Sequence, residues 1–94
     1  MRAAHQIRRA KVPHPLVWVE WDDSATPEPR WQWSDQYEAP ETVKCISVGF
    51  LVANTKGSIA LAPNIGDVTC SRHQMCCVIR IPRTAVKLLL RLRR

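Results

Sequence analysis

The fold is decided by the stretch Met75-Cys76-Cys77-Val78-Ile79-Arg80-Ile81, followed by Pro82-Arg83-Thr84 and then by Ala85-Val86-Lys87-Leu88-Leu89-Leu90-Arg91-Leu92. Two apolar runs joined by a proline favour two short strands in a bent β structure. As strands, each run gathers apolar side chains on one face; these are Met75, Cys77, Ile79 and Ile81, and then Val86, Leu88, Leu90 and Leu92. A helix from Thr84 is the competing interpretation, because threonine caps helices and Ala, Leu, Lys and Arg favour them. The proline hinge favours the strand.

The segment upstream of position 24 also alternates as a half-buried strand does. Val17, Val19 and Trp21 face one side, whereas Trp18 and Glu20 face the other. We therefore expect a strand from Leu16 with a core face and a solvent face.

The middle of the chain predicts a hairpin. Residues 42–54 form the longest expected strand, with a bulge at 47–49 where the alternation fails beside a glycine. Residues 54–57 supply turn chemistry with glycine placed late, and 58–62 form the returning strand. Residues 63–67 are predicted to be a loop.

The length of 94 residues limits the chain to one domain with one core. Residues 1–15 are predicted to be a flexible basic tail. Residues 16–94 are predicted to be a single mainly-β domain, a small and partly open barrel of about five strands. An irregular acidic insertion interrupts it at 25–41.

The charge is strongly polarised along the chain, although the net value is only +6. Seven of the eight acids lie between Glu20 and Glu41, with Arg30 as the one base there, and no acid follows Asp67. A basic flank steers a protein toward nucleic acid, phosphorylated ligands or acidic protein surfaces, and a solvated face is the plain alternative. No run of about 20 apolar residues and no signal peptide is present, so we expect no membrane contact and a cytoplasmic location with free cysteine thiols.

A zinc site is the sharpest chemical candidate in the sequence. Cys70, His73 and Cys76 recur every three residues, and a fourth ligand would come from Cys77, Cys45 or His14. The alternative is that Cys76 and Cys77 begin a buried strand, since structural zinc sites normally use two separated ligand pairs. No local motif fixes a histidine beside a cysteine, so we expect no enzymatic activity.

Four tryptophans lie between positions 18 and 33. Trp21 is expected in the core. Trp18 projects outward beside Glu20, so it is the tryptophan that we most expect to be exposed and to anchor a protein partner. Trp31 and Trp33 are expected to cover an open barrel end. Their functional interpretations are contact with the partner or a stacking platform for bases.

A basic row is predicted near the carboxyl terminus. Its members are Arg80, Arg83, Lys87 and Arg91. The row suits phosphate contacts to nucleic acid or to a nucleotide signal. Protection of an edge strand is the alternative.

Four short segments resemble a group of small, uncharacterised proteins of bacteriophages and prophages; they are residues 19–24, 47–52, 60–63 and 79–83. A looser similarity is to SH3-like and Sm-like barrels, whose last two strands are joined by one tight turn. The resemblance implies a compact β-barrel with no assigned active site. The expected function is a phage-type accessory protein that binds a host protein in the bacterial cytoplasm, for example as an inhibitor of a defence complex. The alternatives are an oligomeric barrel that binds nucleic acid or a nucleotide, and a small zinc-stabilised domain.

Overall fold

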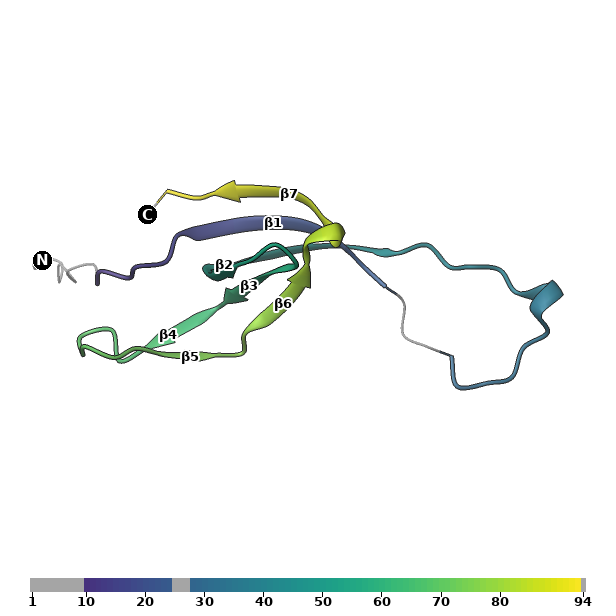
Figure 1. Cartoon of the computed structure of the whole chain (residues 1–94), viewed down its shortest axis with the longest axis horizontal. Helices are drawn as coiled ribbons and strands as arrows, with labels where there is room; N and C mark the ends of the chain where they lie inside the picture. The colour runs from purple at the N-terminus through teal and green to yellow at the C-terminus, as the bar shows by residue number, and fades with distance from the viewer. Residues whose placement is uncertain (1–9, 25–27, 94) are drawn as a thin grey trace, which may run out of the picture.

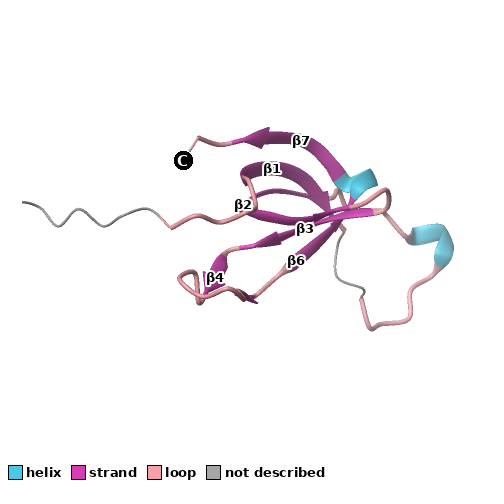
Figure 2. Cartoon of the chain, turned by 60° about the vertical axis from the view of Figure 1, so that its left-hand side comes forward, coloured by secondary structure: helices cyan, strands magenta, loops and turns pink. Residues whose placement is uncertain are grey.

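The computed structural model describes residues 10–24 and 28–93 and shows a mainly-β chain. Five strands form one antiparallel sheet in the order β6-β3-β2-β1-β7 (Figure 1). Their bounds are β1 Leu16–Asp23, β2 Val43–Asn54, β3 Ser58–Ala62, β6 Ile79–Pro82 and β7 Val86–Arg91. The sheet is strongly curved, and β6 and β7 splay apart from a one-turn 3-10 helix, η2 (Arg83–Ala85), so it is not closed into a barrel (Figure 2).

The strand prediction for residues 84–92 is confirmed, because β7 occupies most of that segment. The single strand predicted over 75–81 is wrong. The run is divided into β5 (Gln74–Cys76) and β6, and Cys77 between them has a φ of 64° in the left-handed region. The predicted loop at 63–67 is also wrong, since β4 (Asn64–Gly66) pairs with β5 in a separate two-stranded sheet.

The core lies on the inner face of the curved sheet. Its fully buried members are Val17, Val19, Ile59, Leu61 and Ile81. Ile59 lies opposite Ile81 across the β3–β6 pair, so strand register fixes the core at this edge of the sheet. Burial of each such side chain contributes roughly 1.5–3 kcal/mol. The predicted core face of β1 is confirmed, with Trp21 packed against this cluster.

Strand β2 bends where its pairing with β3 shifts register, between Leu51 and Ala53. The bulge therefore lies beyond the predicted position at 47–49. Gly49 does not form the bulge. A Cβ at this position would lie 3.1 Å from the carbonyl oxygen of Ala62. Glycine at 49 lets the backbones of β2 and β3 approach closely.

The hairpin predicted at 54–57 is confirmed and is anchored to η2. The Thr55 amide donates to the Ser58 carbonyl at 2.9 Å, which closes the turn. Arg83 Nε donates to the Thr55 carbonyl at 3.0 Å, and its Nη2 donates to Asn54 Oδ1. The end of β2 and the start of η2 are thus joined through one side chain.

The described part of the insertion between β1 and β2 is irregular, as predicted, apart from a one-turn 3-10 helix, η1 (Ser34–Gln36). We call its described residues 28–42 the arm. Figure 1 shows the arm extending away from the sheet, on the side opposite β4, β5 and the end of β7. Of the predicted tail, residues 1–9 lie outside the described residues. No helix in the described ranges is long and apolar enough to cross a membrane.

Candidate functional site

The arm presents aromatic side chains to solvent. Trp31 is 102% exposed, Trp33 is 76% exposed and Tyr37 is 55% exposed. The Gln36 amide donates to the Trp33 carbonyl at 3.0 Å, so the one-turn helix η1 follows Trp33 directly. The prediction that Trp31 and Trp33 cover a barrel end is wrong. The arm carries mainly polar and charged residues around them, and water solvates these more favourably than the apolar core would.

The arm is also the acidic part of the molecule. Arg30 is the one base of the arm, and its Nη2 lies 3.1 Å from Glu28 Oε2 in an exposed ion pair. Three further carboxylates, Asp35, Glu38 and Glu41, are all exposed. The arm therefore combines large aromatic surface with net negative charge, a combination suited to a basic protein surface.

Trp18 lies apart from the arm tryptophans, on the outer face of β1. Its Nε1 donates to Glu20 Oε2 at 2.9 Å, and the ring is half-buried. The exposure expected of Trp18 is therefore only partial, and Trp31 is far more exposed. The structure does not bring the three predicted partner-binding tryptophans into one site.

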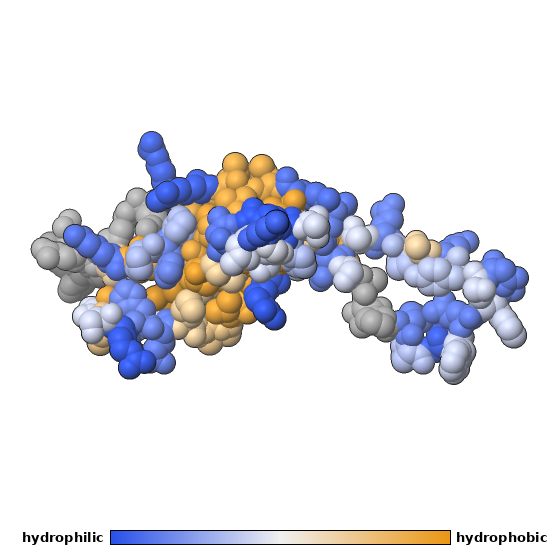
Figure 3. Space-filling view, in the orientation of Figure 1, coloured by the Kyte–Doolittle hydropathy of each residue, from blue (hydrophilic) through white to orange (hydrophobic). Residues whose placement is uncertain are grey.

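Trp18 belongs instead to an apolar row on the outer face of the sheet. Its register partners are Leu90 of β7 and Val48 of β2, and both are exposed. The next row along the strands pairs Glu20 with Leu88 and with Ile46. Figure 3 shows apolar colour gathered over the sheet, whereas the arm is polar in colour.

The sequence did not predict this outer surface, because its alternation places Leu88 and Leu90 on the same apolar face as Val86. The β1–β7 pairing shifts register between Glu20 and Trp21, which leaves Lys87 as an extra residue in β7. The alternation therefore breaks, so that Val86 and Leu89 pack against the core while Leu88 and Leu90 face solvent.

The four residues of the predicted basic row are distributed over different elements. Arg80 lies in β6 opposite Ala60, at one edge of the sheet, whereas Lys87 and Arg91 lie in β7 at the other edge. Arg83 is bonded to the hairpin, and Lys87 Nζ lies 3.9 Å from Asp22 Oδ2. They do not form one continuous stripe on a single strand.

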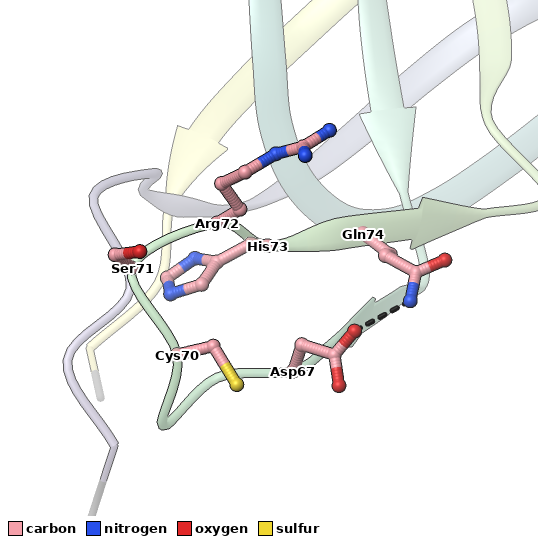
Figure 4. A pocket seen from close by; sticks show the side chains of 6 residues that line it. All are labelled: Asp67, Cys70, Ser71, Arg72, His73 and Gln74. Carbon is pink, nitrogen blue, oxygen red and sulfur yellow. Dashed lines mark hydrogen bonds between the residues drawn. The ribbon is translucent and has the colours of Figure 1, made fainter.

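The loop between β4 and β5 encloses a hollow of about 480 Å³ (Figure 4). Its lining residues are Asp67, Cys70, Ser71, Arg72, His73 and Gln74. The Cys70 amide donates to the Asp67 carbonyl at 2.9 Å, and Gln74 Nε2 donates to Asp67 Oδ2 at 2.5 Å. These bonds close the loop on itself.

The predicted zinc ligands are only partly brought together. Cys70 and His73 line this hollow, but Cys76 lines a neighbouring one. Within residues 10–24 and 28–93, no group of three or more histidine, cysteine, aspartate or glutamate side chains is placed to hold a metal ion.

Cys76 and Cys77 place two thiols side by side. Their sulfur atoms lie 3.0 Å apart and both residues are exposed, so the alternative to the zinc site, in which they begin a buried strand, is also wrong. The pKa of the Cys76 thiol is raised above its ordinary value. The largest cause is the hydrogen bond with Cys77, followed by the charge of Cys77 and by desolvation.

Comparison of the chain with protein-family models, with curated proteins and with solved structures gave no match.

Proposed function

We propose that this chain is a non-catalytic binding module that recognises a basic protein surface through its acidic aromatic arm. The observation that carries the proposal is the exposure of Trp31 and Trp33, at 102% and 76%, on a segment outside the core. Tryptophan left in water forgoes a large gain from burial, and tryptophan is enriched at the centres of protein interfaces.

The charge of the arm supports a protein partner rather than a nucleic acid. Asp35, Glu38 and Glu41 lie in the same segment as the exposed rings, and phosphate groups would be repelled by their negative charge. The same carboxylates speed the approach of a positively charged partner by long-range attraction. A partner surface with a shallow apolar pocket ringed by lysine or arginine fits both features.

We further infer that the sheet is an opened relative of the SH3-like and Sm-like barrels. The support is the strand order β6-β3-β2-β1-β7 together with the single turn η2 between the last two strands. In this arrangement the arm is the connection between β1 and β2. Loops at sheet ends commonly carry binding function on a rigid scaffold.

A bacterial host protein is the first partner to test, in keeping with the resemblance to phage-encoded proteins. The experiment is affinity capture from a bacterial lysate with and without nuclease, comparing the native chain with the double variant Trp31→Ala/Trp33→Ala. The matched control is Met75→Ala, which removes another exposed apolar side chain far from the arm.

We expect a captured protein that survives nuclease, is retained by Met75→Ala and is lost with the double variant. Loss of two interface tryptophans should lower affinity by at least about 30-fold, for roughly 2 kcal/mol. Equal capture by the double variant, or capture that disappears with nuclease, would exclude the arm as the binding element.

A further inference from the structure

Cys76 and Cys77 differ from the other two cysteines by having a thiol as a neighbour. Their sulfurs are 3.0 Å apart, about 1 Å beyond the length of a disulfide bond. Cys45 is half-buried and its Sγ contacts the Val43 carbonyl at 3.5 Å. Cys70 is exposed, and none of the other residues that line its hollow carries a thiol.

We propose that Cys76 and Cys77 form a reversible oxidation site, a pair of adjacent thiols that hydrogen peroxide converts to an intramolecular disulfide. Both sulfurs are exposed, so a small oxidant reaches them without any opening of the core. Their separation places the second sulfur ready to attack as soon as the first is oxidised. The site is independent of the arm and of its partner.

The two steps balance with one molecule of peroxide. One thiol of the pair, as its thiolate, attacks a peroxide oxygen, so that an S–O bond forms, the O–O bond breaks, and hydroxide leaves to become water. The sulfur of the other cysteine then attacks the resulting sulfenic acid, so that the S–S bond forms and the S–O bond breaks. The proton of this second thiol leaves with that oxygen as a second water. Two thiols are oxidised and one peroxide is reduced by two electrons.

The two thiols influence each other, because the hydrogen bond with Cys77 and the charge of Cys77 raise the pKa of the Cys76 thiol. Whichever thiol of the pair is oxidised first, the other lies 3.0 Å away and acts as the resolving thiol.

The disulfide formed here should be easy to reduce. Adjacent Cα atoms lie about 3.8 Å apart across a trans peptide, below the usual range of about 4.4–6.8 Å for a disulfide. Such a bond is strained, and strained exposed disulfides have more oxidising potentials. The disulfide would also lie at the corner between β5 and β6, where the backbone of Cys77 already has a φ of 64°.

The test uses the full chain treated with hydrogen peroxide, alkylated, digested with trypsin and examined by mass spectrometry. Cleavage after Arg72 and Arg80 gives the peptide His73–Arg80, which contains Cys76 and Cys77 and no other cysteine. We expect this peptide to lose two hydrogen atoms, to resist alkylation and to recover both thiols with dithiothreitol. Met75 lies in the same peptide and is exposed, so its sulfoxide shows that the peroxide reached the site.

Two variants separate this pair from ordinary thiol oxidation. Cys70→Ser should form the Cys76–Cys77 disulfide to the same extent and at the same rate as the native chain, and this rate should be the same at two protein concentrations. Cys76→Ser should abolish the loss of two hydrogens and leave Cys77 as a sulfinic acid or in a disulfide between two chains. The proposal is overturned if the native peptide carries Met75 sulfoxide while both thiols still alkylate, or if its cysteines end as sulfinic acids or bridge two chains.

Discussion

Trp21 Nε1 donates a hydrogen bond to Ser47 Oγ at 3.0 Å, joining the inner faces of β1 and β2 across 26 positions of sequence. The indole is half-buried against the core cluster, so its N–H has limited access to water. The bond satisfies a polar group that the sequence places at the margin of an apolar core.

Removing the acceptor should therefore destabilise the fold. Ser47→Ala leaves the indole N–H without its partner, and we expect the free energy of unfolding to fall by about 1 kcal/mol. Denaturant unfolding of Ser47→Ala, of Trp21→Phe and of the double variant measures the coupling between the two side chains. Additive effects in that cycle would mean that the bond contributes nothing to stability.

Two adjacent leucines should respond differently to truncation because of the register shift at Lys87. Leu89 packs against the core and Leu90 is exposed, so Leu89→Ala should lower the free energy of unfolding by about 2 kcal/mol, near the low end for a core leucine. Leu90→Ala should change it by no more than about 0.5 kcal/mol. Equal losses, measured by denaturant unfolding, would contradict the bulge and its reversal of the strand faces.

Two glycines should also respond differently to alanine. A Cβ at Gly49 meets the Ala62 carbonyl oxygen at 3.1 Å, so Gly49→Ala must push β2 and β3 apart, at a cost of about 1–3 kcal/mol. At Gly57 a Cβ meets nothing within 4 Å and φ is not positive. Gly57→Ala should therefore be neutral or stabilising by up to about 1 kcal/mol, because alanine restricts the unfolded chain. Thermal melts of both variants would show the ordering, and a Gly57→Ala variant that melts below Gly49→Ala would refute it.

The sequence predicted the elements whose signal is local. The alternation of Val17 and Val19 located β1, the turn residues at 54–57 located the hairpin, and the proline at 82 correctly favoured a strand over a helix after Thr84. These features depend on the chemistry of neighbouring residues, which a reader of the sequence sees directly.

The features that the sequence missed depend on strand pairing. The extra residue at Lys87 becomes evident only when β7 is aligned with β1, and it is this residue that moves Leu88 and Leu90 to the outer face. A positive φ at Cys77 has no local signature, since cysteine carries a Cβ and disfavours that region. The contact between two sulfurs at this corner was therefore hidden as well. The exposure of Trp31 and Trp33 depends on the arm leaving the sheet, which no local pattern reports.

The pairing of Asp23 with Val43 has a consequence for how such a molecule can diversify. These residues close the base of the arm, so whatever lies between them begins and ends at two adjacent points of a finished sheet. Doubling the length of a flexible loop costs only about 0.6 kcal/mol in closure entropy. Segments of other lengths and compositions can therefore be exchanged at this junction while the scaffold keeps its packing, and new specificities can be acquired there without redesign of the interior.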